Sequence, residues 1–387
     1  MDLMERMSTY LWLVEDTRNK SYIKYKLSDI LFLLVCGIVC GCDNAEAIIQ
    51  FGEEREEFFR EYTELERMPC AKTLLNVLQI INPERLQLCL HGILRNVFCR
   101  EQLPGQRQIC IDGKTICSTA AMNDYDKPLH IVSGIMADNC LTLGQITVND
   151  KSNEIPAVKE LLNLMDVKGA VVTMDAMHCQ KDTVDIIIGN KADYVVQLKS
   201  NQGNFYEDVY AMFDKKYMDE ADTDGEYEIF ETIEKGHGRV ERRVCYVLRG
   251  IEYFTDYLST WRGLKKIFAV KRIVTSGGKT SEEISCYLSS ANTTAEKLLM
   301  YTRKHWQIES FHWLLDVNFG EDASKVRNRN AQICLNVMRK FSVSMLKKYI
   351  EDHSVKRKSI SANMRKCLLN PRYLEDVLRY FCRQSAL

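Results

Sequence analysis

The stretch Gly169-Ala-Val-Val-Thr-Met-Asp175 is a short apolar run, rich in β-branched residues, that ends in an aspartate. Its length and composition predict a buried strand. A second run of the same kind, Gln108-Ile-Cys-Ile-Asp112, lies earlier in the chain. An aspartate at the end of a buried strand is unfavourable unless another group pairs with it. One such aspartate is more often structural than functional, but two of them indicate a shared site.

The segments around these two strands predict an α/β (α+β) fold in which helices pack on a mixed sheet. The pattern runs strand, strand, strand, helix, strand, helix, strand. The elements are expected, in that order, at residues 107–117, 129–137, 141–148, 153–165, 170–175, 180–188 and 194–199. Asp138-Asn139, between the second and third strands, is typical of a hairpin turn.

The rest of the chain predicts helical regions on both sides of this core and a β-rich insertion within it. Helices are expected at residues 27–40 and 45–62, twice within 70–98, at 295–317 and from 331 onward. Residues 201–290 alternate in polarity, with Ser276-Gly-Gly278 as a hairpin turn. We expect a helical first domain at residues 1–100, followed by the first part of the core at 101–200 and the insertion at 201–290. A helical part of the core follows at 291–345, and a basic helical tail at 346–387.

Composition indicates a globular protein of two or three domains, because the chain has 387 residues, 46% of them hydrophobic and 27% charged. Its 15 cysteines include no Cys-x-x-Cys pair, which favours reduced thiols in the cytoplasm. The apolar run at residues 30–42 is too short to cross a bilayer, and no basic leader precedes it, so we expect no membrane attachment. Residues 339–387 hold 12 Lys and Arg against 4 Asp and Glu. This tail is either a phosphate-binding surface or a solvated helical one.

A third acid is predicted within His305-Trp-Gln-Ile-Glu-Ser-Phe-His-Trp-Leu-Leu-Asp316. At helical spacing this stretch places His305, Glu309, His312 and Asp316 along one face, where a core helix would be apolar. Its other side is apolar and can pack tightly, which would present Glu309 in a fixed direction. Both histidines are more often hydrogen-bonded packing residues than ligands, and the two tryptophans more often pack the helix than stack on a base.

Asp112, Asp175 and Glu309 together would suit hard divalent cations, which prefer oxygen ligands. Two Mg²⁺ ions about 3.5–4 Å apart would activate the attacking oxygen and stabilise the leaving oxygen of a phosphoryl transfer. Glu309-x-x-His312 also matches the motif of di-iron helical bundles, but that site requires a second copy of the motif. We find no second copy on another predicted helix.

Several short motifs, in order along residues 15–345, closely resemble the H-repeat-associated insertion-sequence transposases of the DDE superfamily. They are Asp16-Thr-Arg18, Tyr25-Lys-Leu-Ser-Asp29, Ile111-Asp-Gly-Lys114, Lys151-Ser-Asn-Glu154, Thr173-Met-Asp-Ala-Met-His-Cys-Gln180, Ala192-Asp-Tyr194, Gln197-Leu-Lys-Ser-Asn-Gln202, Gly236-His-Gly-Arg239, His305-Trp-Gln-Ile-Glu309 and Asp316-Val-Asn-Phe-Gly-Glu-Asp322.

The resemblance implies an RNase H-like catalytic core in which Asp112, Asp175 and Glu309 form the DDE triad and bind Mg²⁺, or Mn²⁺, as two ions. It implies metal-dependent cleavage of double-stranded DNA at terminal inverted repeats, followed by strand transfer to target DNA, by a homodimer assembled on DNA. Related transposases often place Tyr and Arg before the glutamate and Lys after it. Here the positions four before and seven after Glu309 hold His305 and Asp316, which departs from that pattern. Asp316 and Glu321 are therefore alternative candidates for the third acid.

Six basic side chains are candidates for contacts with DNA, although for an isolated basic residue a solvent-exposed role is the default. They are Lys114, Lys199, Arg303, His305, Arg327 and Arg329. An alternative function is a catalytically inactive DNA-binding protein derived from a transposase. Metal-dependent cutting would indicate the enzyme, and salt-sensitive binding alone would indicate the binding protein.

Overall fold

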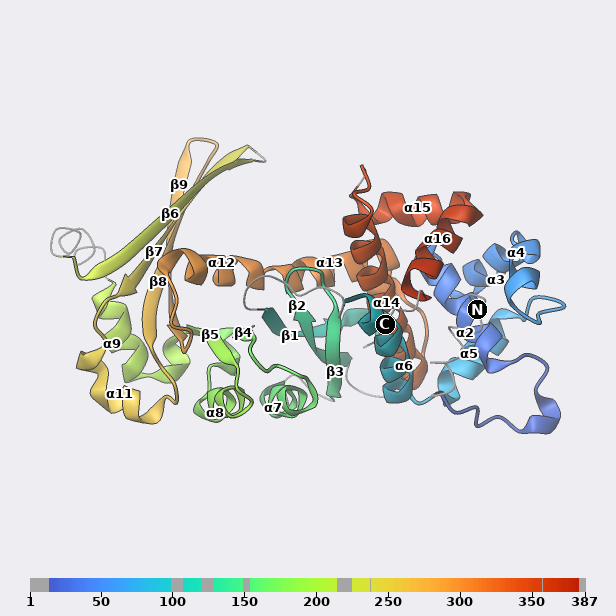
Figure 1. The fold of residues 1–387 in the computed structure, drawn as a ribbon, viewed down its shortest axis with the longest axis horizontal. Coiled ribbons are helices and arrows are strands. Elements are labelled where there is room, and N and C mark those ends of the chain that lie inside the picture. The colour runs from blue at the N-terminus through green and yellow to red at the C-terminus, as the bar shows by residue number, and fades with distance from the viewer. Residues whose placement is uncertain are drawn as a thin grey trace.

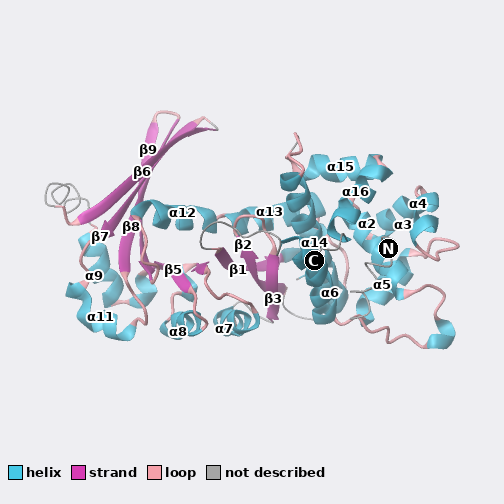
Figure 2. Cartoon of the chain, viewed as in Figure 1, coloured by secondary structure: helices cyan, strands magenta, loops and turns pink. Residues whose placement is uncertain are grey.

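The computed structural model describes residues 14–98, 107–119, 128–148, 154–213, 225–236, 238–356 and 358–382. Residues 151–153, His237 and Arg357, which belong to segments singled out from the sequence, lie outside the described residues. The molecule is elongated, with helices at one end and long twisted strands at the other (Figures 1 and 2). None of the described helices is both long and apolar enough to span a membrane. The cysteines whose side chains the structure describes are free thiols.

The centre of the molecule is a mixed sheet in the order β3-β2-β1-β4-β5. The first three strands are antiparallel, and β4 and β5 run parallel to β1. The strands are β1 (Gln108–Ile116), β2 (Leu129–Met136), β3 (Thr142–Val148), β4 (Val171–Met174) and β5 (Asp193–Leu198). Together with the two helices between β3 and β5, this confirms the predicted order of elements and the RNase H-like core.

Helices cover both faces of the central sheet. On one face lie α7 (Glu154–Leu164) and α8 (Lys181–Gly189), on the other α12 (Ala295–His305) and α13 (Gln307–Phe319) (Figure 1). Neighbouring strand residues point to opposite faces, so Val172 packs with α7 and α8 while Val171 packs with α12. Short 3-10 helices follow several strands: η2 (Cys117–Thr119), η4 (Ala176–His178) and η5 (Ser200–Gln202).

The β-rich insertion extends the central sheet instead of forming a separate one. Its last strand pairs antiparallel with β5, which gives one nine-stranded sheet in the order β3-β2-β1-β4-β5-β9-β8-β7-β6. The added strands are β6 (Tyr227–Gly236), β7 (Arg239–Leu248), β8 (Lys266–Ser276) and β9 (Lys279–Ser289). Gly277 and Gly278 both have positive φ, which confirms the predicted hairpin turn between β8 and β9.

The insertion also contains helices that the alternating sequence pattern did not predict. They are α9 (Asn204–Met212), η6 (Glu252–Phe254) and α11 (Thr255–Thr260). Phe205 of α9 stacks on Tyr257 of α11 and contacts the buried Trp261. These aromatic contacts belong to the same core as α7 and α8.

The amino-terminal and carboxyl-terminal helices form one body around a shared apolar core. The amino-terminal elements are η1 (Lys20–Tyr22), α2 (Leu27–Val39), α3 (Ala45–Glu53), α4 (Glu56–Tyr62), α5 (Ala71–Ile80) and α6 (Pro83–Phe98). The carboxyl-terminal elements are η7 (Glu321–Ala323), α14 (Arg329–Asp352), α15 (Ile360–Leu369) and α16 (Pro371–Cys382). Helix α2 is apolar on all sides and lies at the centre, as expected of a core helix.

Three expected boundaries differ in the structure. The single helix predicted at residues 45–62 is divided into α3 and α4, because the backbone leaves helical dihedrals at Arg55 (φ −126°, ψ 28°). The single helix predicted at residues 295–317 is divided at Trp306 into α12 and α13. Helix α14 runs through residues 345 and 346 without a break, so the basic tail begins inside a helix that packs against the amino-terminal helices.

Candidate active site

Asp112 and Asp175 lie side by side because the strands that carry them are parallel neighbours. β1 pairs with β4 up to Ile111 and Met174, which lie opposite each other. Asp112 follows Ile111 within β1, and Asp175 directly follows β4, so both come after the end of the parallel pairing. β1 continues to Ile116 through its pairing with β2. Asp112 therefore lies inside a strand, in agreement with the strand expected at residues 107–117, although the apolar run before it ends there.

Glu309 lies in the first turn of α13, close enough to Asp175 for the two charges to interact. Burial raises the pKa of Asp112 to about 6, and the negative charge of Asp175 adds to the rise. Partial burial and the charge of Asp175 also raise the pKa of Glu309. Mutual repulsion of this kind is expected where carboxylates share a site. The three predicted acids are therefore electrostatically coupled through Asp175.

His305 holds Asp175 from the carboxyl end of α12. Its Nε2 lies 3.4 Å from Asp175 Oδ1, and its Nδ1 lies 3.0 Å from Thr173 Oγ1. Burial alone would lower the pKa of His305, but the contacts with Asp175 and Cys110 together outweigh burial and raise the pKa to about 10. The contact with His305 lowers the pKa of Asp175. A charged imidazole therefore fixes an ionised Asp175, which is a more specific role than the packing that the sequence suggested.

His312 lies beside the other aspartate but in the neutral form. Its Nδ1 is 3.7 Å from Asp112 Oδ2, and its Nε2 is buried without a hydrogen-bond partner. Burial, with the positive charges of Lys340 and Lys114, lowers the pKa of His312 to about 3. The two histidines of the predicted polar face thus contact one aspartate each, in opposite charge states.

A buried cluster behind the aspartates contains Glu154, His130 and His178. Glu154 Oε1 lies 3.5 Å from His130 Nε2 and 3.8 Å from His178 Nε2. Burial alone would raise the pKa of Glu154, but the two imidazoles lower it to about 2. A Cβ atom at Gly113 would lie 1.8 Å from Glu154 Oε1, so only glycine fits beside Asp112. From the sequence, Glu154 and His178 were evident only as parts of motifs, since their contact joins segments far apart in the chain.

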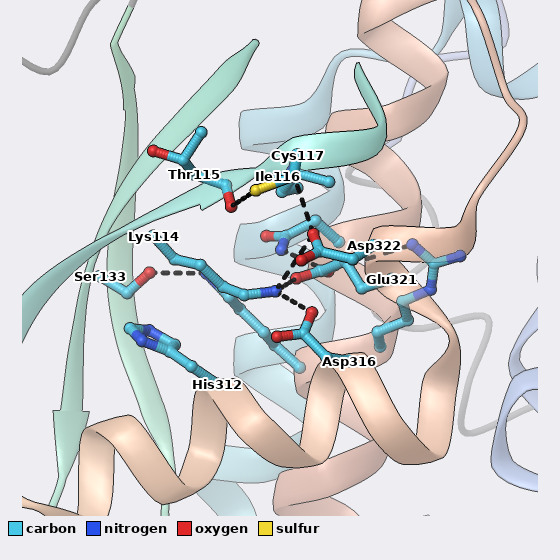
Figure 3. Close-up of polar contacts among 12 residues, drawn as sticks. Lys114, Thr115, Ile116, Cys117, Ser133, His312, Asp316, Glu321 and Asp322 are labelled. Atoms are coloured by element: carbon cyan, nitrogen blue, oxygen red, sulfur yellow. Dashed lines mark hydrogen bonds and ion pairs between the residues drawn. The ribbon is translucent and has the colours of Figure 1, made fainter. Parts of the chain in front are cut away.

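A second buried cluster joins β1 to the end of α13 and η7 through Lys114 (Figure 3). The ammonium group of Lys114 contacts Asp316 and lies 2.8 Å from Glu321 Oε2 and 3.9 Å from Asp322 Oδ1. Glu321 is fully buried, and Asn336 donates a hydrogen bond to its Oε1 at 2.8 Å. Lys114 is therefore engaged by carboxylates and nearly buried, which favours a structural role over contact with DNA.

The same cluster bears on the identity of the third acid. Asp316 and Glu321, the two substitutes for Glu309, both pair with Lys114. Glu309 instead interacts electrostatically with Asp175. The described contacts therefore favour Glu309 over its substitutes.

A cleft of about 700 Å³ opens beside the acids, between α12, α13 and the strands of the insertion. Asp175 and Glu309 line it, and so do Lys199, Arg303 and His305, three of the residues predicted to contact DNA. Lys199 lies near enough to Asp175 to contribute to the lowering of its pKa.

Trp306 and Trp313 do not pack the helix as expected. Their side chains are 60% and 59% exposed, and Trp306 lines the cleft beside Glu309. Of the remaining predicted DNA contacts, Arg327 is exposed and lines a different groove, next to the amino-terminal helices. Arg329 donates a hydrogen bond from Nη2 to the carbonyl oxygen of Val148 at 3.4 Å. Neither arginine lines the cleft that contains the acids.

The chemistry of the three acids fits a divalent cation, because their oxygen donors repel each other and a cation would relieve that repulsion. Within the described residues, no group of three or more His, Cys, Asp and Glu side chains is arranged to hold a metal ion. Mg²⁺ commonly binds one or two carboxylates and completes its shell with water and substrate phosphates.

Comparison with known proteins places these features in a family. The family described as "Transposase DDE domain" matches residues 103–345, and the family described as "DDE_Tnp_1-associated" matches residues 8–93. The chain is 35% identical over 380 residues to "Putative transposase YncI" of Escherichia coli O157:H7, across 97% of this chain and 95% of that protein. It is 31% identical over 386 residues to "H repeat-associated putative transposase YhhI" of Escherichia coli strain K12, across 97% of this chain and 98% of that protein.

Among solved structures, a piggyBac transposase synaptic complex with hairpin DNA matches with a TM-score of 0.47 and 12% identity, across 99% of this chain and 79% of that chain. The sequence matches carry the assignment, since the DDE domain match spans more than half of the chain and both relatives span nearly all of it. This chain belongs to the DDE superfamily of insertion-sequence transposases, as its motifs predicted.

Proposed function

We propose that this protein is an active transposase that cuts double-stranded DNA at the terminal inverted repeats of its insertion sequence and joins the cut ends to target DNA. One observation carries the proposal: Asp112 and Asp175 directly follow the paired residues Ile111 and Met174 of two parallel strands, and Glu309 interacts electrostatically with Asp175 at the edge of a cleft. The catalytic residues in this proposal are Asp112, Asp175 and Glu309.

The same three carboxylates would hold Mg²⁺, or Mn²⁺, as two ions. When bound, such ions lower the pKa of the attacking water or hydroxyl group and stabilise the leaving oxygen of a phosphoryl transfer. His305 would keep Asp175 ionised and in place, since it contacts Asp175 at 3.4 Å. Lys199, which lines the cleft near Asp175, would position the phosphate.

The reaction would proceed in two phosphoryl transfers at this site. In the first, water attacks the phosphorus atom at the end of the element, and the bond to the 3′ oxygen breaks to leave a 3′-hydroxyl group. In the second, that hydroxyl group attacks a phosphodiester of the target DNA and displaces another 3′ oxygen. Both ends of an element must be held together, so we expect a homodimer on DNA, acting in the cytoplasm.

The test is cleavage of labelled DNA that carries the flanking inverted repeats, with Mg²⁺ or Mn²⁺. The unaltered protein is compared with Asp112→Asn, Asp175→Asn and Glu309→Gln, which remove charge and keep shape. We expect nicking at the ends by the unaltered protein and a loss of at least about 100-fold in each variant, while DNA binding persists. Glu296→Gln is the matched control, because Glu296 is exposed on the neighbouring helix α12 and lies outside the cleft lining.

Each other outcome has a definite meaning. Binding without cutting by the unaltered protein would indicate the inactive DNA-binding alternative. Cutting that survives Glu309→Gln but not Asp316→Asn or Glu321→Gln would move the third acid to one of those residues. Cutting that does not require metal would rule out the proposed mechanism.

A further inference from the structure

Strand β7 carries a pattern of charge that the proposed active site does not use. Arg239, Glu241 and Arg243 alternate along the strand, so their side chains lie on one face of the sheet. Arg242 lies on the opposite face, where it pairs with Glu231 at 2.6 Å. Glu241 is only 4% exposed, whereas the arginines on either side reach solvent.

Glu241 contacts three arginines at once. Its carboxylate lies 3.4 Å from Arg239 Nη2 and 2.7 Å from Arg243 Nη2, and it also accepts a hydrogen bond from Arg272 Nε. Arg272 stands on β8 directly opposite Arg243. Like charges in directly opposite positions of two strands destabilise a sheet, so one buried glutamate compensates for three arginines only in part.

The other acids near these arginines are more exposed and farther away. Arg243 lies 3.3 Å from Glu234, and Arg272 lies 3.9 Å from Glu283. The glutamate side chains are 44% and 67% exposed, and exposed pairs of this kind contribute little. An anion that binds between the arginines would therefore be stabilised by the positive charge that the nearby carboxylates do not neutralise.

The arginines face the proposed active site. Arg239, Arg243 and Arg272 line the same cleft as Asp175 and Glu309. Glu234 joins this surface to the active-site helices, because it also pairs with Arg303 of α12 at 2.7 Å. The side chains on β7 and β8 are thus held in a fixed position relative to the acids.

We propose that Arg239, Arg243 and Arg272 bind the backbone phosphates of the DNA strand that leads away from the phosphate to be cut. This inference rests on the proposed function. The planar guanidinium group can donate two parallel hydrogen bonds to a phosphate. The contacts with Glu241 restrict the orientation of all three guanidinium groups in the protein without DNA. Contacts to phosphates fix the position of DNA without reading its sequence, so this surface sets where the strand lies and not which sequence is chosen.

The test is equilibrium binding to a labelled duplex of arbitrary sequence over a series of salt concentrations, with EDTA present so that cutting plays no part. Each phosphate contact contributes roughly 0.9 to the slope of log K against log salt. We expect Arg243→Gln and Arg272→Gln each to reduce this slope by roughly 1 and the double variant by roughly 2. Arg242→Gln, which removes the same charge from the other face of β7, is the matched control and should keep the slope.

Thermal unfolding monitored by circular dichroism separates a loss of fold from a loss of contact. Arg239→Gln provides a second test, since Arg239 is the most exposed of the three and its removal leaves Glu241 with two partners. Equal slopes in folded arginine variants and the unaltered protein would overturn this inference and leave the proposed function standing. An equal loss with Arg242→Gln would also overturn it, because net charge alone would then explain binding. No DNA binding by the unaltered protein would overturn both.

Discussion

At Gly113 the absence of a side chain lets a buried carboxylate approach the backbone next to Asp112. Glu154 Oε1 occupies the space that a Cβ atom would take, and the carboxylate is held there by His130 and His178. Three sequence motifs that are far apart in the chain thus meet at one point behind the aspartates. The glycine after Asp112 is needed for packing, and the glutamate and histidine support the site from behind.

Replacement of Gly113 by alanine should therefore destabilise the fold. The new Cβ would lie 1.8 Å from Glu154 Oε1, and overpacking of this kind typically costs roughly 1–3 kcal/mol of unfolding free energy. Gly189→Ala is the matched control, since no atom lies within 4 Å of its Cβ position at the end of α8. Urea unfolding of both variants measures the difference, and equal stability of the two would contradict this account of Gly113.

The contact between His305 and Asp175 should appear as a pH dependence of stability. The pKa of His305 is raised from 6.5 to about 10 in the folded protein, so the contact stabilises fully below about pH 6.5. Its contribution should decline as the pH rises toward 10. We expect the unfolding free energy to fall more steeply over this range in the unaltered protein than in His305→Gln. Parallel curves for the two proteins would show that His305 is not held in its charged form.

At the scale of elements, the Lys114 cluster joins strand β1 to the end of α13 and to η7, and so fixes the helix that carries Glu309. Lys114→Met would leave Glu321 buried without its ammonium partner, a change that typically costs about 3–5 kcal/mol. The double variant with Glu321→Leu should recover only part of the loss, because it removes the unpaired carboxylate but leaves the buried Arg339 without its contact with Glu321 at 4.0 Å. Chemical denaturation gives the unfolding free energies of the unaltered protein, the single variant and the double variant.

The matched control for this cluster is Lys159→Met. Lys159 pairs with Asp182 at 3.0 Å between α7 and α8, but the side chain of Asp182 is 78% exposed. An exposed pair contributes little, so stability should hardly change. Similar losses from Lys114→Met and Lys159→Met would show that burial does not matter to the first pair.

The break between α12 and α13 shows what local pattern can and cannot predict about elements. Trp306 keeps helical dihedrals (φ −60°, ψ −9°), and neither glycine nor proline marks the position. The periodicity of apolar residues therefore runs through the break, and one helix was the natural prediction. The strands that lead to Asp112 and Asp175 were predictable, since each is a compact apolar run whose burial is already evident from its composition.

At the scale of the whole molecule, the features that the sequence could not predict are contacts between distant segments. The exposure of Trp306 and Trp313 depends on which elements cover α13, and the engagement of Lys114 depends on where η7 lies. The pairing of β9 with β5 joins the core and the insertion into one sheet, and the sequence of neither strand alone predicts it. The resemblance to a family supplied the three acids of the proposed triad, but the histidine beside each aspartate became evident only in three dimensions.

The continuous sheet has a consequence for the length of DNA that the protein can engage. Five interstrand steps separate β1, which carries Asp112, from β7, which carries Arg239 and Arg243. At about 4.8 Å per step, the two strands lie at most about 24 Å apart. This span corresponds to about seven nucleotide steps of a duplex strand. Each strand from β1 to β7 is paired with its neighbour in the described sheet. The number of strands in the insertion would therefore limit the distance between the proposed cut and the phosphates that β7 is proposed to bind.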